Sequence, residues 1–223
     1  MKVLLLTREY PPDVYGGAGA HVDYLSRELA RLVAVEVRTF GDQELRAGNL
    51  EVHGFRFAQA GSQDAPKQFL LALQALRISV AFAARPIDAH LVHCHTWYAH
   101  FGGVLAKILY GIPLVVTAHS LEPLRPWKRE QLGRGADLSA WIERTALEAA
   151  DAIIAVSQEM KADILRHFHV APERVHVIWN GIDAGEYRRV EERDRLACFG
   201  LELDRPTVLF LGRISRQKGI LHL

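Results

Sequence analysis

Short apolar segments alternate with amphipathic helical patterns along most of this chain, and this alternation restricts the fold more than any other feature. Residues 2–7 form an apolar run typical of a buried parallel strand. Apolar residues then recur at helical spacing from Val22 to Leu32, and residues 33–40 alternate as a second strand would. Strand, turn-rich loop, helix and strand in this order predict a βαβ unit.

The same alternation continues to residue 179. The further predicted elements are strands at 50–57, 89–94, 113–118, 153–156 and 175–179, and helices at 69–84, at 101–110, at 137–150 with Asp137 or Ser139 as the cap, and after Ser157 as the cap. About six parallel strands with crossover helices predict an α/β fold with a Rossmann-like, doubly wound parallel sheet. Such sheets bind ligands beyond the carboxyl ends of their strands, so we expect functional loops to begin at Arg8, His95, His119, Ser157 and Asn180.

A change in composition divides the chain. We predict a Rossmann-like domain over residues 1–182, a charged linker or helix over 183–205, and the start of a second domain over 206–223. The second domain would open with an apolar strand at 207–211 and a glycine-flanked loop at 212–219. The sequence ends four residues after this loop, so we expect the second domain to be truncated.

Charge and composition exclude several classes of protein. The formal net charge of +1 provides no broad basic field for nucleic acid or for an anionic membrane. The apolar run Val3–Leu6 is shorter than a secretory signal, and no continuous apolar stretch reaches 18 residues. Cys94 and Cys198 lie far apart and form no disulfide framework. We therefore expect a cytoplasmic protein.

The first loop carries Gly16, Gly17 and Gly19 between a strand and a helix. Glycines at a helix N-terminus let backbone N–H groups approach an anion, but a tight turn requires glycine too. The spacing is not that of the G-x-G-x-x-G fingerprint, which counts against a nicotinamide-dependent oxidoreductase, and no Gly-Lys-Ser/Thr follows. The sequence leaves an anion site and a purely structural turn open.

A second cluster follows the strand at 89–94. His93 and His95 share one face of that strand and could bind zinc, but no carboxylate or further His/Cys pair stands at ligand spacing, so we predict no metal site. Thr96, Trp97 and Tyr98 would then form a polar, aromatic loop suited to hydrogen bonding with a sugar and to stacking on it.

Two further loops carry candidate residues. His119 follows a strand and could bond a sugar hydroxyl, but taken alone it is better explained as a histidine satisfied by nearby backbone. Arg213 and Lys218 lie five residues apart on the glycine-flanked loop, a spacing that suits a diphosphate. A solvated basic loop is the alternative there.

Together these segments resemble the retaining glycosyltransferases of the GT-B fold, and within them the actinobacterial type of glycogen synthase or α-maltose-1-phosphate synthase. The segments that carry the resemblance are Thr7–Pro12, Tyr15–Gly19, Val92–Ala99, Thr117–Lys128, Ala155–Ser157, Asn180–Asp183 and Gly212–Gly219. The resemblance implies two facing Rossmann-like domains with the reaction in the cleft between them. It also implies transfer of glucose from ADP-glucose, with retention, to an α-1,4-glucan or to glucose 1-phosphate, without a cofactor.

The resemblance assigns roles to individual residues. Gly16 and Gly17 would lie at the donor diphosphate or an acceptor phosphate, and His119 would contact the 6-hydroxyl of the transferred glucose. Arg213 and Lys218 would neutralise the leaving diphosphate, which is the main catalytic contribution of such a site. The predicted substrate-binding residues also include Thr96, Trp97, Tyr98 and Asn180.

Two alternatives remain at this point. The donor could be UDP-glucose, because the residues that read the base would lie beyond Leu223. The chain could also be a non-catalytic module that binds sugar phosphates. Since most of the predicted donor domain is absent, we expect this chain alone to have little or no transferase activity. Oligomeric state is not predicted.

Overall fold

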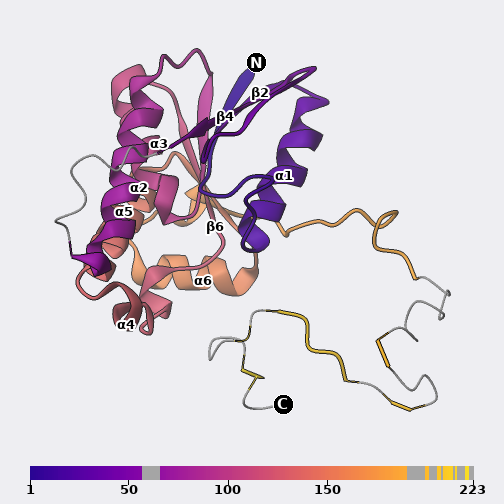
Figure 1. Ribbon diagram of the computed structural model, residues 1–223. Coiled ribbons are helices and arrows are strands. Elements are labelled where there is room, and N and C mark those ends of the chain that lie inside the picture. Colours follow the sequence, from indigo (N-terminus) through magenta and orange to yellow (C-terminus); the bar gives the residue numbers. More distant parts are fainter. Residues whose placement is uncertain are drawn as a thin grey trace. The chain divides into compact units, whose positions relative to one another are not determined.

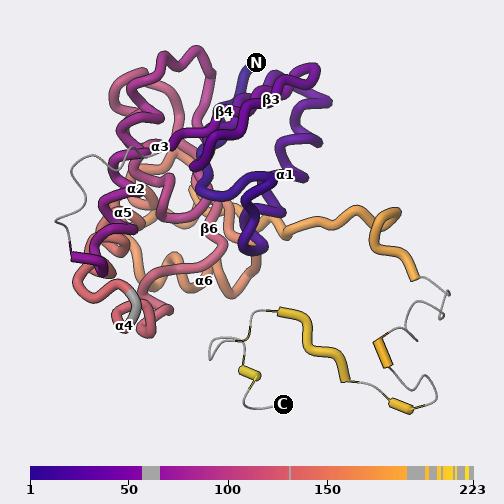
Figure 2. Tube along the Cα trace, in the orientation of Figure 1, coloured from indigo at the N-terminus to yellow at the C-terminus, as the bar shows by residue number. Residues whose placement is uncertain are grey.

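The computed structural model describes residues 1–56 and 66–189 continuously, together with residues 199, 200, 205, 206, 208–212, 214, 219 and 220 (Figure 2). The chain divides into two compact units, Met1–Gly181 and Ile182–Leu223. All the helices and strands described below lie in the first unit.

An eight-stranded sheet forms the centre of the first unit, in the order β3-β4-β2-β1-β5-β6-β7-β8. The strands are β1 (Lys2–Leu6), β2 (Ala34–Phe40), β3 (Glu44–Ala47), β4 (Leu50–Phe55), β5 (Leu91–His95), β6 (Leu114–Ala118), β7 (Ala152–Ala155) and β8 (Val175–Val177). Every neighbouring pair is parallel except β3 and β4, which are antiparallel. This confirms the predicted α/β class with a mostly parallel sheet.

Helices cover both faces of the sheet, as the burial of consecutive residues along β1 requires. The helices are α1 (Gly17–Ala30), α2 (Lys67–Ala84), α3 (Trp97–Tyr110), α4 (Lys128–Leu132), α5 (Gly135–Ala149) and α6 (Gln158–His167), with 3-10 turns η1 (Glu122–Leu124) and η2 (Pro172–Arg174). Figure 1 shows α1 on one side of the sheet and α2, α3 and α5 on the other. Leu5 packs with Val22 of α1, whereas Leu4 and Leu6 belong to the larger core that contains Phe82 of α2.

Helix α2 tests the expectation that no segment spans a membrane. It has 18 residues with a mean hydropathy of 1.2, which is long and apolar enough to cross a membrane by length and composition alone. A core helix of a globular domain meets the same criterion, and α2 buries Ala75, Ile78 and Phe82 inside the unit. Its contacts with α3 and α5 place it in the helical layer.

Four sequence predictions differ from the structure. β3 was not expected, and it makes the edge of the sheet antiparallel. Helix α3 begins at Trp97, four residues before the predicted start. Helix α5 begins after Arg134, and neither Asp137 nor Ser139 caps it, because Asp137 pairs with Arg129 and Ser139 is buried. Residues 208–211, the described part of the predicted strand at 207–211, form no strand.

The predicted cap of α6 is confirmed. The Ser157 hydroxyl oxygen accepts a hydrogen bond from the Met160 N–H at 3.0 Å. Ile164 of this helix and Phe168, which follows it, are buried.

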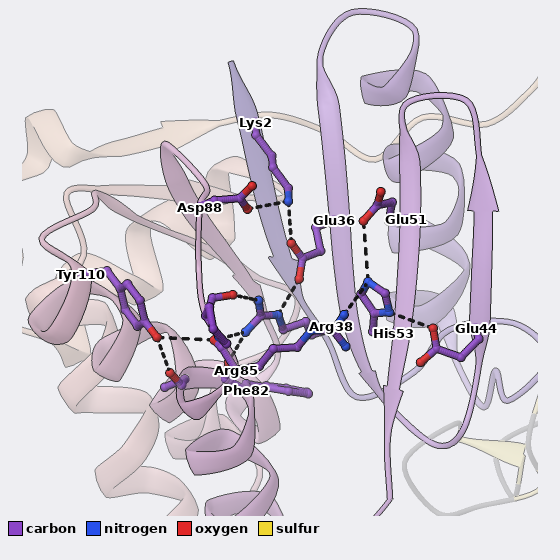
Figure 3. Close-up of polar contacts among 12 residues, drawn as sticks. Lys2, Glu36, Arg38, Glu44, Glu51, His53, Phe82, Arg85, Asp88 and Tyr110 are labelled. Carbon is purple, nitrogen blue, oxygen red and sulfur yellow. Dashed lines mark hydrogen bonds and ion pairs between the residues drawn. The ribbon is translucent and has the colours of Figure 1, made fainter.

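A buried arginine closes the end of α2 against the sheet (Figure 3). Arg38 of β2 is fully buried and donates to the carbonyl oxygens of Phe82, Arg85 (2.9 Å) and Pro86 (2.7 Å). Its Nε forms an ion pair with Glu36 at 2.7 Å. The last carbonyls of a helix have no partner within it, so this side chain satisfies groups that burial would otherwise leave unpaired.

Candidate sugar-binding site at the strand ends

The candidate site lies where the strand order reverses. From β1 the chain builds the sheet outward through β2 and β4, and then returns to place β5 on the other side of β1. A reversal of this kind leaves a crevice at the carboxyl ends of the two central strands, where open α/β sheets bind ligands. The side chains that follow β1, β5 and β6 therefore define the site.

The glycine loop after β1 already holds an anionic oxygen. Glu9 Oε2 accepts hydrogen bonds from the backbone N–H groups of Tyr15 (3.0 Å) and Gly16 (2.9 Å), and Gly16 is the N-cap of α1. A carboxylate at a helix N-terminus is stabilised by the helix dipole. Gly16 and Gly17 are exposed. The loop can therefore solvate an anion, and the predicted role of these glycines at a phosphate stays a prediction.

Three histidines from separate elements meet beside this loop. His95 ends β5, His119 follows β6, and His21 lies on α1. His95 Nδ1 and His119 Nε2 are 3.2 Å apart, and the ring centroids of His21 and His119 are 4.9 Å apart. Sequence analysis named His95 and His119 separately. It did not find His21, because only the fold brings α1 over the ends of β5 and β6.

Burial keeps this cluster uncharged at neutral pH. It lowers the pKa of His119 to about 4, and the pKa of His95 lies well below its usual value for the same reason, with neighbouring histidines adding to the effect. His93, directly behind, is hydrogen-bonded to the Thr117 hydroxyl at 2.7 Å. Neutral imidazoles can exchange hydrogen bonds with sugar hydroxyls, and they do not require an anionic partner.

The turn from β5 into α3 differs from the predicted loop. Thr96 has a φ of 63°, which is uncommon outside glycine, and its Oγ1 is buried with no partner among the described residues. Trp97 and Tyr98 lie in the first turn of α3 with stacked rings 4.1 Å apart. Trp97 is buried in a core cluster with Leu132 and Ile142, whereas Tyr98 is only partly buried. Strained backbone of this kind concentrates at functional sites.

Cations surround the Tyr98 ring. The guanidinium carbon of Arg8, directly after β1, lies 4.1 Å from the ring centroid, and Lys128 Nζ of α4 lies 5.8 Å from it. Arg8 forms no ion pair in the described part of the chain. Arg125 Nη1 is 3.3 Å from Ser120 Oγ and 3.8 Å from Glu122 Oε1. We call Arg8, Arg125 and Lys128 the cationic cluster.

Buried acids hold part of this cluster in place. Glu122 Oε1 accepts from Lys128 Nζ at 2.5 Å, and its Oε2 accepts from the Ser139 hydroxyl at 2.6 Å. Glu143 Oε2 accepts from the Glu122 backbone N–H at 2.7 Å, and burial raises the pKa of Glu143 to about 8. The sequence does not predict that these residues lie together, because η1, α4 and α5 share no recognisable motif. The residues are Arg125, Lys128, Glu122 and Glu143.

The structure does not bring the remaining predicted site residues to the histidines or to the cationic cluster. Asn180 is exposed and follows β8, which is two strands beyond β6, or about 10 Å across the sheet. Arg213 and Lys218 lie outside the described residues. Their predicted contacts with a diphosphate stay predictions.

The fold matches the N-terminal half of GT-B glycosyltransferases. Residues 15–186 match the family Glycosyltransferase Family 4, and the chain belongs to this family. The resemblance drawn from the sequence is thereby confirmed at the level of family and fold.

Over its whole length the chain is 47% identical to an alpha-maltose-1-phosphate synthase of Mycolicibacterium smegmatis, of which it covers 56%. Among solved structures it is similar to sucrose-phosphate synthase of Thermosynechococcus elongatus, with a TM-score of 0.74 and 21% identity over 98% of this chain and 57% of that one. It is also similar to Anabaena HepE in complex with UDP-glucose, with a TM-score of 0.58 and 21% identity over 88% of this chain and 50% of that one. The chain thus spans about half the length of the relatives that it matches.

Proposed function

We propose that this chain provides the acceptor-binding half of a retaining glucosyltransferase that moves glucose from ADP-glucose to glucose 1-phosphate or to the end of an α-1,4-glucan. The 47% identity to a protein named alpha-maltose-1-phosphate synthase supports this reaction, since the matched region covers the whole of this chain and so includes every element of the site. The observation that carries the proposal is the convergence of His95, His119, Tyr98 and Arg8 at the carboxyl ends of adjacent strands.

The neutral imidazole of His119 would bind a hydroxyl of the transferred glucose. Gly16 and Gly17 would lie near a phosphate, which would replace the Glu9 carboxylate on the backbone N–H groups. Arg213 and Lys218 would stabilise the charge that develops on the leaving diphosphate. A cytoplasmic location belongs to this proposal, since Cys94 is a free, buried thiol.

The cationic cluster favours a phosphorylated acceptor over a neutral glucan. Arg8 has a planar guanidinium with no carboxylate partner among the described residues, and it is stacked on Tyr98. Arg125 has a buried Nε that no described group satisfies. These two guanidinium groups would hold a phosphate dianion by charge-assisted hydrogen bonds, whereas a glucan carries no negative charge to pair with them.

The base of the donor nucleotide is a separate question from the acceptor. HepE, which is similar in fold, is named as a complex with UDP-glucose. UDP-glucose is therefore the second candidate donor, and the assay must include both nucleotides.

The test is transfer of labelled glucose by a chimera in which residues 1–205 precede the C-terminal half of the Mycolicibacterium smegmatis relative. We expect the chimera to convert ADP-glucose and glucose 1-phosphate to a phosphorylated disaccharide, and we expect the chain alone to do so little or not at all. His119→Ala should lower kcat by roughly 100-fold, as for loss of a transition-state contact. A folded chimera without transfer to either acceptor would contradict the proposal.

A further inference from the structure

The histidines at the strand ends have the composition of a transition-metal site. One ring nitrogen from each of His21, His95 and His119 lies within 4.8 Å of the other two. The three side chains come from α1, β5 and the loop after β6, so the sheet and its covering helix hold them together. Sequence analysis weighed zinc only for His93 and His95, and without His21 it predicted no metal site.

The ligand type selects a class of metal. Three imidazoles without a carboxylate suit Zn²⁺, Co²⁺, Ni²⁺ or Cu²⁺, whereas Mg²⁺ and Ca²⁺ prefer oxygen ligands. A tetrahedral Zn²⁺ with Zn–N bonds of about 2.0–2.1 Å separates its ligand nitrogens by about 3.4 Å. Nitrogens as far apart as 4.8 Å would therefore approach by about 1.4 Å. His21 and His119, which would make this movement, are only partly buried.

The surroundings also favour ligation. His95 is fully buried, and its Nε2 has no hydrogen-bond partner among the described residues. A buried polar atom without a partner is destabilising, and a metal bond or a new hydrogen bond would remove that cost.

We propose that His21, His95 and His119 bind one divalent transition-metal ion, Zn²⁺ being the natural example, with a fourth position open to solvent. Three protein ligands and an exchangeable position form an open site rather than a closed structural one. Ion binding needs only this cluster and does not depend on the proposed transferase activity.

One consequence rests on the proposed function. If His119 binds the transferred glucose, an ion on its ring nitrogen takes the place of that hydrogen bond. Zn²⁺ would then inhibit transfer, and the inhibition would weaken as the sugar donor concentration rises.

The experiment is a Co²⁺ titration of the tag-free chain at pH 7.5, followed by visible absorption, with Zn²⁺ added afterwards as competitor. We expect one equivalent of Co²⁺ to give the intense bands of a tetrahedral site and Zn²⁺ to displace it. His21→Ala and, separately, His119→Ala should each weaken binding roughly tenfold or more. His176→Ala, which removes an exposed histidine of β8, should leave the affinity unchanged.

Circular dichroism and the unfolding temperature establish that each variant is folded, and His21→Gln replaces His21→Ala if that variant is not. Equal affinities for the protein and its His21 and His119 variants would overturn the proposal, as would an equal loss in His176→Ala. Metal binding that is lost in these variants while the chimera shows no transfer would support the site and reject the transferase.

Discussion

Glu143 is an acid whose surroundings oppose its charge. It is buried on α5, and its carboxyl accepts the backbone N–H of Glu122. Burial raises its pKa to about 8, and the Glu122 carboxylate adds to the effect, while Lys128 and Arg125 oppose it. Folding therefore favours the protonated acid, whereas the unfolded chain carries a carboxylate above the ordinary glutamate pKa of 4.5.

This difference predicts a pH dependence of stability. Between pH 4.5 and about 8 the folded state holds a proton on Glu143 that the unfolded state has lost, so raising the pH favours unfolding. The group contributes a loss of up to about 1.4 kcal/mol per pH unit in this window. Glu143→Gln keeps a hydrogen-bond acceptor but cannot ionise. Urea unfolding at pH 5, 6.5 and 8 should therefore show a smaller decline in the free energy of unfolding with rising pH than in the unsubstituted chain. Glu130→Gln, an exposed acid of α4, should not, and an unchanged slope in Glu143→Gln would refute this assignment.

Gly19 and Gly17 form a matched pair on the same helix. A Cβ on Gly19 would lie 2.8 Å from Glu9 Cβ and 3.1 Å from Val14 Cγ1, whereas a Cβ on Gly17 has nothing within 4 Å. Gly19→Ala should displace the Glu9 carboxylate from the glycine loop and lower the free energy of unfolding by about 1–3 kcal/mol. Gly17→Ala should leave the unfolding temperature nearly unchanged, and equal losses in both variants would count against the close packing.

At the residue scale, the sequence predicted only some of the residues of the candidate site. His95 and His119 were predicted because each ends or follows an apolar strand, and parallel strands gather such residues at one edge. His21 and Lys128 carry no such signal, since their contacts depend on how α1 and α4 pack. Arg8 begins one of the predicted loops, but only the fold places it on the ring of Tyr98.

At the element scale, Arg38 links the end of α2 to β2. Replacing it with methionine would leave the Pro86 carbonyl without its donor and the Arg85 carbonyl with only the Tyr110 hydroxyl at 3.4 Å. Glu36 would keep Lys2 as its remaining partner. Breaking a buried pair of this kind costs about 3 kcal/mol or more.

Urea unfolding of Arg38→Met and Arg46→Met separates this effect from the loss of a positive charge. Arg46, on the exposed edge strand β3, pairs with Glu51 of β4. An exposed ion pair of this kind is worth about 1 kcal/mol or less. Comparable destabilisation by the two substitutions would mean that Arg38 does not hold α2.

The elements that the sequence missed lack the local signals on which such predictions depend. β3 is exposed along its whole length, so it has no apolar pattern to reveal it. The start of α3 was placed four residues late because Thr96 enters the helix with a positive φ and makes no side-chain cap bond. Apolar runs and periodicity located β1, β2, α2 and β6 closely, since the three strands are buried along most of their length and α2 buries one face.

At the scale of the whole molecule, one unit carries the sheet and every described residue of the candidate site. The class of fold followed from alternating strands and helices, and the family followed from motifs at the strand ends. The acceptor did not, because the preference for phosphate proposed above depends on Arg8, Arg125 and Lys128, which only tertiary structure brings together.

Isothermal titration of glucose 1-phosphate into the chain tests the central claim most directly, because it needs no donor and no second domain. We predict saturable binding to one site that exceeds binding of glucose or inorganic phosphate. Arg8→Gln should weaken it roughly tenfold, the loss of one charge-assisted hydrogen bond. Arg27→Gln, which alters an exposed pair on α1, should bind normally. Undetectable binding, or equal affinity in Arg8→Gln, would contradict an acceptor site at these strand ends.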